Sequence, residues 1–511
     1  MTSSLQKAAY RPGFQQSETS RAELYAYTHG DDPVFRHPPQ TLTFRGTGEQ
    51  DGSFSLLSIE TNKSLGSPAG TWTATVKQAA GQPPLDELIL DDDWLDIAFT
   101  RWGEPYHVMR GLTETISRRV VVDGTGATTT AWDISGYDHG KVWMRTPVFF
   151  NKYIGENVGG GATLRAFFMS QGAFGSPDRV VDTFLRAFLQ EFKDRGNVSW
   201  QLPPSMPGVF LDTDRFFANS YTYYTEDFTN TPKRLDYNAH MLDHQNSTLW
   251  DLATQWSDPQ FCELYTELLD ARTGRYPEPG KTLDIDETQM AVIFRDRPFP
   301  HQAGGRPAFA SNWFDLPLYE VSLQDIRANN TSRSGTERKN AFFAQPIIGS
   351  ESHGQQAQLA APLWDREDIR RHGIRRMDYT SRYVAVDEDN LGLTTYQREQ
   401  MRDWFGLNHY FYAGTLELGH SRPDIRVGTR LRIVGKSGEI DDETYYVEGV
   451  SHQWQYGSGA RTALQVSRGW RGTDRSLMQA VGGLSNRYEL ALKAVPVVQN
   501  DTTAAFGGDL A

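Results

Sequence analysis

Apolar and polar residues alternate along much of the C-terminal part of this chain. Pairs such as Leu416/Leu418 and Leu464/Val466 have the even spacing of a half-buried strand. Glycines between these runs provide turn positions. The pattern predicts strands over 412–418, 423–434, 445–454 and 462–469. Short strands joined by such turns favour a small antiparallel barrel.

A second set of strands is predicted nearer the N-terminus. In Thr71–Lys77 the side chains of Trp72, Ala74 and Val76 fall on one face of the strand. Further apolar runs follow at short, regular spacing, over 94–99, 107–112, 118–122 and 128–138. They predict five or so strands and hence another compact barrel.

Between the two strand-rich regions the spacing changes to that of helices. Ser176 and Pro177 suit the N-cap and first position of a helix that Gly196 can end. A second helix is predicted over 247–256, and a short one over 395–404, ahead of the last strands. The middle of the chain is therefore expected to be mixed α/β.

These patterns predict an α+β, β-rich fold with two small antiparallel β-barrel domains flanking a mixed α/β middle region. Five parts are expected along the chain. They are an N-terminal arm (1–40), a first β-barrel domain (41–150), a middle α/β domain (151–340), a second β-barrel domain (341–470) and a C-terminal extension (471–511). The extension is read as an arm that only a neighbouring chain orders.

Composition narrows the class of protein. The 511 residues are 38% hydrophobic and 12% aromatic, which indicates folded, β-rich domains. The net charge of −13 argues against wrapping nucleic acid. No apolar run approaches the roughly 20 residues of a membrane span, and no signal peptide is recognisable. We expect a soluble chain made in a cytoplasm, with Cys262 as a buried, inert thiol.

Candidate catalytic and metal-binding residues are few. His240 and His244 have the spacing of two imidazoles on one helical face, but Met241 stands where a zinc hydrolase needs glutamate. Asp92, Asp93 and Asp96 resemble the paired carboxylates of a glycosidase, although consecutive aspartates usually form a solvated turn before a strand. We therefore predict no catalytic residue, no metal site and no cofactor.

The glycine and arginine motifs do not indicate a binding or catalytic site any more clearly. Gly435–Ser437 lacks the first glycine of a phosphate-binding loop, and Gly457–Gly459 reads as a hairpin turn. A cluster of arginines precedes the last strands, comprising Arg366, Arg370, Arg371, Arg375 and Arg376. It is either a solvated helix face or a set of ion pairs between subunits.

The residue choices within the strands carry a resemblance that periodicity alone does not. They include Tyr412-Ala-Gly-Thr-Leu-Glu-Leu418, Tyr445-Tyr-Val-Glu-Gly-Val-Ser-His452, Thr462-Ala-Leu-Gln-Val-Ser-Arg-Gly469 and Ser135-Gly-Tyr-Asp-His-Gly-Lys141. Residues of the middle region match the same family in order, namely Trp250, Asp258, Pro259, Glu263, Arg295, Pro298 and Phe299. Together these motifs resemble the baseplate or tail hub proteins of contractile-tailed phages and related contractile injection systems.

The resemblance implies a structural virion protein and no enzyme. It would be a homotrimer whose two barrels per chain present six similar units to a sixfold tail tube. The partners implied are the tail tube protein, the spike protein and baseplate wedge or sheath components. DNA or an effector would pass through the channel without sequence-specific binding. We expect a carboxylate-lined lumen from the net charge, assembly in the host cytoplasm and a place in the tail baseplate of the virion.

Two alternatives remain open from the sequence. A tail-associated glycan hydrolase would rest on Asp92, Asp93 and Asp96 and on the aromatic content. A receptor- or carbohydrate-binding tail protein would use a β-barrel and exposed tryptophans. Neither explains why two barrel-like regions flank a helical one.

Overall fold

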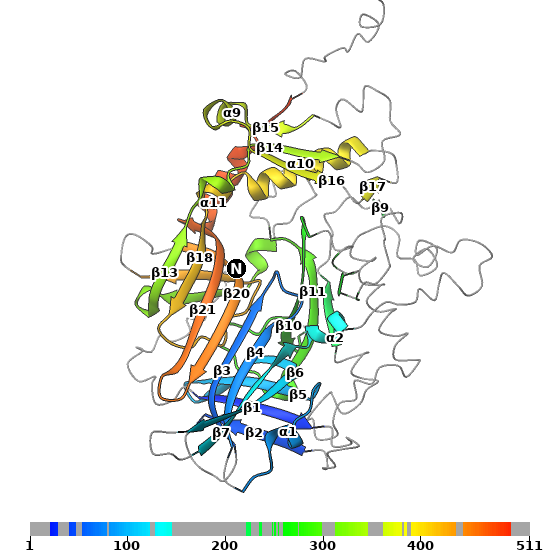
Figure 1. Ribbon diagram of the computed structural model, residues 1–511. Coiled ribbons are helices and arrows are strands. Elements are labelled where there is room, and N and C mark those ends of the chain that lie inside the picture. Colours follow the sequence, from blue (N-terminus) through cyan, green and yellow to red (C-terminus); the bar gives the residue numbers. More distant parts are fainter. Residues whose placement is uncertain are drawn as a thin grey trace, which may run out of the picture.

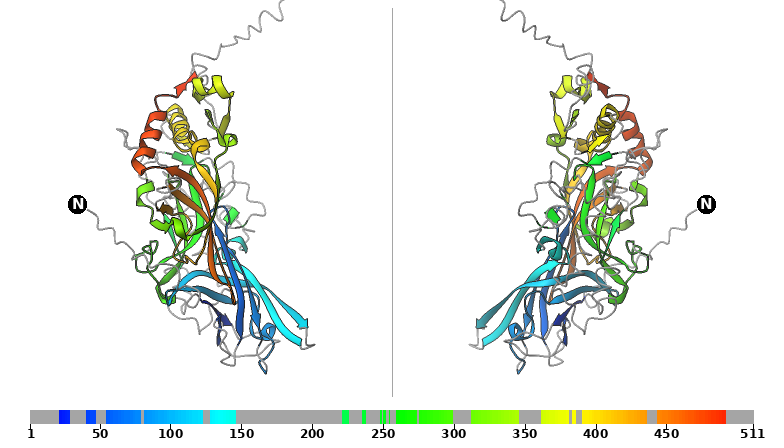
Figure 2. Two further views of the ribbon diagram at one scale, coloured as in Figure 1. Left: turned by 90° about the vertical axis from the view of Figure 1, so that its left-hand side faces the viewer. Right: turned by 90° about the vertical axis from the view of Figure 1, so that its right-hand side faces the viewer.

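The computed structural model describes the strand-rich parts of the chain and some of its helices. It covers residues 21–28, 40–46, 54–78, 81–122, 128–145, 221–225, 235–237, 248, 250–251, 254, 259–273, 275–298, 312–345, 361–380, 383–385, 390–435 and 443–491. These residues form an elongated body with a barrel at one end, a second large sheet beside it, and a small sheet with helices at the other end (Figures 1 and 2). The predicted β-rich fold class is confirmed.

The first barrel closes on itself. Its seven strands are β1 (Ala22–Thr28), β2 (Gln40–Arg45), β3 (Ser55–Ser64), β4 (Thr71–Lys77), β5 (Trp94–Arg101), β6 (Glu104–Val122) and β7 (Thr128–Asp138). They pair in the order β3-β2-β1-β5-β6-β7-β4, and β4 returns to β3. All pairs are antiparallel except the single parallel pair of β2 with β3. Two short helices, α1 (Leu85–Leu88) and α2 (Gly140–Arg145), flank the barrel.

Two details of this barrel differ from the sequence prediction. Residues 22–28, expected within an N-terminal arm, form β1, whose Ala22, Leu24 and Ala26 lie in the barrel core. The two strands predicted over 107–112 and 118–122 are one strand, β6. A β-bulge between Thr113 and Thr115 absorbs the irregularity and lets the ladder continue.

The second sheet uses strands from widely separated parts of the chain. They are β12 (Leu318–Ser322), β13 (Ile326–Ser332), β18 (Tyr412–Leu418), β19 (Arg430–Val434), β20 (Glu443–Gln455) and β21 (Gly459–Arg471). The order is β13-β18-β21-β20-β19-β12, with only β12 and β19 parallel among these pairs. The sheet therefore begins before residue 341, where the second barrel is predicted to begin. The predicted strand over 423–434 is regular only in β19, although Ile425 and Val427 are buried.

A three-stranded sheet covers the core of the second sheet. It consists of β8 (Tyr221–Thr225), β10 (Cys262–Asp270) and β11 (Thr288–Asp296), in the order β10-β11-β8. Tyr265, Ala291 and Ile293 of this small sheet join Leu416 and Val466 of the large one in a single apolar cluster. Strands of the middle region thus complete the core of the second sheet.

A helical module occupies the far end of the molecule. Its sheet consists of β14 (Ala341–Gln345), β15 (Leu363–Trp364), β16 (Arg376–Thr380) and β22 (Glu489–Leu490), ordered β16-β14-β15-β22. Helices α9 (Arg366–His372), α10 (Asn390–Phe405) and α11 (Asp474–Leu484) belong to the same module, while β9 (Leu235–Tyr237) pairs with β17 (Tyr383–Ala385). Short 3-10 helices connect elements at Ile285–Glu287, Asn312–Asp315, Leu323–Asp325, Gly335–Glu337 and Asn408–Tyr410.

Part of the predicted C-terminal extension packs against the rest of its own chain. Thr473 caps α11 by accepting a hydrogen bond from the backbone N–H of Ser476. Leu477, Val481 and Leu484 of this helix are buried against the core of the helical module. Residues 474–490 are therefore held within the chain, whereas 492–511 lie outside the described residues.

Candidate functional site

The two large sheets repeat one strand pattern. Successive neighbours in the first barrel are β3, β4, β7, β6, β5 and β1. The second sheet has the corresponding order β13, β18, β21, β20, β19 and β12, so that β3 matches β13 and β6 matches β20. The order of these strands along the chain also corresponds, and the pairs run in the same sense except the last, which is antiparallel for β1 and β5 and parallel for β12 and β19. The β6–β7 hairpin of the first barrel therefore matches the β20–β21 hairpin of the second sheet.

The match extends to individual residues because the β-bulges coincide. Strand β6 has a bulge between Thr113 and Thr115, and β20 has one between Val447 and Gly449. The extra residue is Glu114 in one strand and a glutamate, Glu448, in the other. A second coincidence lies between Leu56 and Ser58 of β3 and between Ile326 and Ala328 of β13. Bulges fix register, so these positions align the two halves of the chain.

The two halves are joined edge to edge by β3 and β20. These strands pair antiparallel from Ser58 opposite Gln455 to Ser64 opposite Gly449. The backbone N–H of Leu65 donates to the Glu448 carbonyl at 2.8 Å, which extends the ladder at one end. We call this pairing the barrel joint; it makes one continuous sheet of both halves (Figure 1).

Trp454 anchors the barrel joint. It belongs to β20 of the second sheet, yet its side chain is only 3% exposed and packs in the core of the first barrel with Trp72 and Ile59. A fully buried tryptophan contributes apolar burial on the order of several kcal/mol. The first barrel therefore depends on the second sheet for part of its core.

Buried charges cross from the first barrel to the middle sheet. Lys63 of β3 pairs with Asp138 of β7 at 2.9 Å, and Thr266 of β10 donates to the same carboxylate at 3.1 Å. Burial raises the pKa of Asp138, but Lys63, His139 and the backbone N–H of Gly140 together outweigh burial, and the pKa lies below its ordinary value. Glu267 lies 3.8 Å from both Lys63 and Arg426, so the second sheet joins the same cluster.

Two further buried ionic clusters, one around Asp96 and one around Asp424, connect the same parts. Arg110 donates to Asp96 at 2.9 Å and to the carbonyl of Ile285 at 3.1 Å, which ties β5 and β6 to the segment before β11. Asp424 is held by Arg101 of the first barrel at 3.0 Å and by Arg422 at 2.8 Å. Desolvation opposes ionisation of Asp424, yet these two guanidinium groups hold its pKa well below the ordinary value. Buried ion pairs between elements favour one relative placement of the parts.

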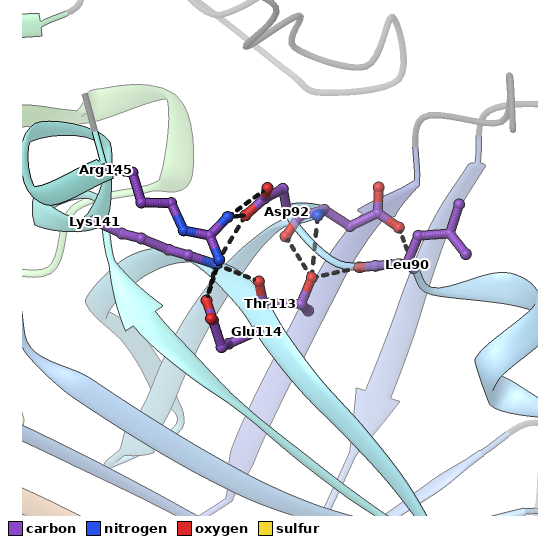
Figure 3. Close-up of polar contacts among 7 residues, drawn as sticks. Leu90, Asp92, Thr113, Glu114, Lys141 and Arg145 are labelled. Atoms are coloured by element: carbon purple, nitrogen blue, oxygen red, sulfur yellow. Dashed lines mark hydrogen bonds and ion pairs between the residues drawn. The ribbon is translucent and has the colours of Figure 1, made fainter. Parts of the chain in front are cut away.

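A fourth ionic cluster lies at the base of the β6–β7 hairpin (Figure 3). Asp92 accepts from Lys141 at 2.8 Å and from Arg145 at 2.7 Å, while Glu114 pairs with the same two cations. Asp92 has a left-handed backbone conformation with φ of 65°. The hydrogen bond from Lys141 is the main reason that the pKa of Glu114 lies below its ordinary value. The cluster fixes α2 against the bulge of β6.

The structure uses the three candidate glycosidase carboxylates as structural partners. Asp92 belongs to the cluster just described, and Asp96 is fully buried against Arg110. Asp93 is also fully buried, and it accepts a hydrogen bond from the backbone N–H of Leu90 at 2.9 Å. Each of the three carboxylates thus has its own structural partner, and no two of them are placed as the acid and base of a glycosidase.

The remaining candidate residues lie either on the surface or outside the described part of the chain. Arg370 and Arg371 pair with Glu367 on the exposed side of α9, as a solvated helix face does; ion pairs between subunits stay a prediction. His240, His244 and the Cys262 side chain lie outside the described residues. Within the described ranges, no group of three His, Cys, Asp or Glu residues is placed to hold a metal ion. None of the described helices combines the length and apolar character that a membrane span needs.

Sequence reasoning missed the barrel joint, although a signal for it exists. Glu114-Thr-Ile-Ser117 and Glu448-Gly-Val-Ser451 occupy the same positions of the two hairpins. A glutamate followed at fixed spacing by a β-branched residue and a serine marks both bulges. Four residues make a weak signal, which gains meaning only when the strand order is known.

Comparison with known proteins gives structural likeness only, since no family model and no curated protein matches the sequence. The tail protein from Neisseria meningitidis MC58 is 13% identical with a TM-score of 0.44, over 87% of this chain and 96% of that one. The 43 kDa tail protein of prophage MuSo2 from Shewanella oneidensis is 11% identical with a TM-score of 0.44, over the same shares. A type VI secretion system component of E. coli, described as similar to the T4 tail proteins gp27 and gp5, is 8% identical with a TM-score of 0.36, over 83% and 75%.

The structures that this chain is similar to are thus phage tail and type VI secretion proteins. At these TM-scores the likeness carries no argument about function.

Proposed function

We propose that this chain is a structural protein of a phage-type tail, the central hub of its baseplate. Three copies would form a closed ring in which two barrel-like units per chain give six similar units. The ring would join the sixfold tail tube to the threefold spike and enclose part of the channel for DNA or effector. Its further contacts would be with baseplate wedge or sheath components, and its location would be the virion tail.

The observation that carries this proposal is the repeat of strand order and bulge positions in the two halves. A chain with two equivalent sheets joined side by side can present the same surface twice. Three such chains present it six times, which is the number a sixfold tube requires. A closed ring of identical heterologous contacts is a common form of oligomer.

The barrel joint suits a mechanical role. Lys63, Asp138 and Glu267 hold the first barrel to the middle sheet with little solvent exposure, and Trp454 fixes the second sheet in the barrel core. Buried ion pairs resist separation because each lost partner leaves an uncompensated charge. The two units of one chain would therefore move as one body when the tail contracts.

The experiment that tests the hub is the native mass of the full chain over a dilution series, followed by electron microscopy of the assembled species. A species of three times 57.7 kDa, seen end-on as a ring with six lobes, is the expected result. A chain that stays monomeric alone and in the presence of tube and spike proteins contradicts the proposal. Release of reducing sugar from cell-wall material, lost in Asp92→Asn, would favour the hydrolase instead.

A further inference from the structure

We infer that neighbouring copies of this chain join by pairing β13 of one copy with the outer part of β6 of the next. The inference rests on the proposed ring and names the strands that close it. It follows from the internal repeat, because β13 corresponds to β3 and β6 corresponds to β20. The contact between copies would then reproduce the barrel joint that β3 and β20 make within one copy.

Both strands have a free edge in the described part of the chain. β13 pairs with β18 alone, and β6 beyond Thr113 pairs with β7 alone. Figure 2 shows the β6–β7 hairpin extending away from the barrel at its lower end. An unpaired edge of this kind is a template for another strand. Each copy has one edge of each sort, so the contact is heterologous and can close a ring.

The coincident bulges fix the register of the pairing. Within the chain, Ser451 lies opposite Asn62 and Trp454 lies opposite Ile59. The corresponding residues place Ser117 of one copy opposite Ser332 of the next, and Val120 opposite Asn329. The same register sets Arg118 opposite Thr331 and Arg119 opposite Asn330. No arginine of β6 then faces an arginine directly, which avoids like-charge repulsion across the strands.

The exposed side chains of β6 also point to a missing partner strand. Val120 occupies the position of Trp454, yet Val120 is 54% exposed where Trp454 is 3% exposed. Val122, two residues further on the same face, is 62% exposed. Apolar side chains that are solvent-exposed at one copy of a repeat and buried at the other indicate a contact still to be made. Pairing with a second copy would cover Val120, whereas Val122 corresponds to Tyr456, which stays 57% exposed beside β3.

The test is a disulfide between the two strands in the full-length chain. In a Cys262→Ser background, Ser117→Cys and Ser332→Cys would place two cysteines directly opposite each other across neighbouring copies. Opposite residues of an antiparallel pair have Cα atoms about 4.5–5.5 Å apart, which a disulfide can span. The off-register control is Ser117→Cys with Ala328→Cys, four residues away on the same face and roughly 13 Å further along the strand.

The expected product after oxidation is a covalent trimer in the matched double variant, and none in either single variant or in the off-register control. A native trimer without this disulfide overturns the strand pairing and leaves the hub intact. A covalent ladder that continues beyond three copies supports the pairing but contradicts the closed trimeric ring. A monomer with no covalent product at the highest soluble concentration overturns the pairing.

A second variant tests the contact independently, in case the cysteine substitutions prevent folding. Val120→Lys with Val122→Lys changes only exposed side chains, so the monomer should keep its melting temperature while association weakens at least tenfold. The matched control is Ile374→Lys, which changes an apolar residue of similar exposure, 56%, in the helical module. Equal association of the valine variant and the wild type would contradict the proposed contact.

Discussion

Trp454 lies directly over Gly46. A Cβ at position 46 would stand 2.4 Å from two carbons of the indole ring, closer than any real contact. Gly46→Ala must therefore push Trp454 out of the first barrel core or displace the segment after β2. We expect the free energy of unfolding to fall by about 1–3 kcal/mol, as overpacking of a core does.

Chemical denaturation with tryptophan fluorescence measures this loss. The control is Gly66→Ala, since a Cβ at Gly66 meets no atom within 4 Å. If both variants unfold at the same denaturant concentration, Trp454 is not fixed in the core as described.

The pair of Lys63 and Asp138 supplies a second prediction. Asp138→Asn removes the carboxylate nearest to the buried Lys63 ammonium and leaves only Glu267 at 3.8 Å, so we expect a loss of about 3 kcal/mol in unfolding free energy. Asp133→Asn removes an exposed ion pair with Arg119 and should cost less than about 1 kcal/mol. Similar losses in the two variants would show that the buried pair does not hold the barrel to the middle sheet.

Gly428 combines two constraints that a matched variant can separate. Its φ is +73°, and an added Cβ would lie 2.3 Å from the Tyr265 hydroxyl and 2.7 Å from Arg295. Gly457 has a φ of +78° with no atom near its Cβ position. Gly457→Ala should cost roughly 1–2 kcal/mol for the left-handed backbone alone. Gly428→Ala should cost at least about 1 kcal/mol more, and equal melting temperatures would contradict the close packing.

His452 gives the barrel joint a pH dependence. Burial lowers the pKa of this imidazole to about 3, whereas an unfolded histidine has a pKa of about 6.5. Since the unfolded chain takes up the proton first, stability falls as the pH drops below about 6.5 and keeps falling to about 3. His452→Gln, which can keep the hydrogen bond with Thr462, should make unfolding less sensitive to acid by roughly 2 kcal/mol at pH 4.5.

The measurement is the unfolding free energy of both proteins at several pH values between 7 and 4.5. Buried carboxylates such as Asp138 affect wild type and variant equally, so the difference isolates His452. His372→Gln, at an exposed position of α9, is the control. Parallel pH curves for wild type and His452→Gln would contradict a buried neutral imidazole.

Local alternation in the sequence was sufficient to place many strands. The predicted strands 71–77, 128–138 and 412–418 have the same limits as β4, β7 and β18, because each buries one face and exposes the other. Ala22–Thr28 was missed since two of its buried positions are alanines, Ala22 and Ala26, and the prolines on either side suggest a loop. The alternation of side chains reports burial of a strand but not its partner strand.

Long-range pairing is what sequence patterns could not provide. Nothing in the composition of β3 or β20 shows that Ile59 lies opposite Trp454, because the pairing joins distant parts of the chain. The ion pairs of Asp96 and Asp424 were likewise hidden, since their arginine partners come from other elements. Asp92 and Asp93, a few residues before Asp96, read as a solvated turn when only sequence neighbours are considered.

The position of Trp454 also sets the order in which the molecule can be completed during synthesis. The first barrel leaves the ribosome early, yet the tryptophan that fills its core and the strand that covers β3 emerge near the end of translation. Until then β3 has a free edge and the barrel core is incomplete, a state prone to pairing with other chains. Folding is thus delayed until almost the whole polypeptide is available, so a prematurely terminated chain cannot produce a finished first barrel that would compete for a place in an assembly.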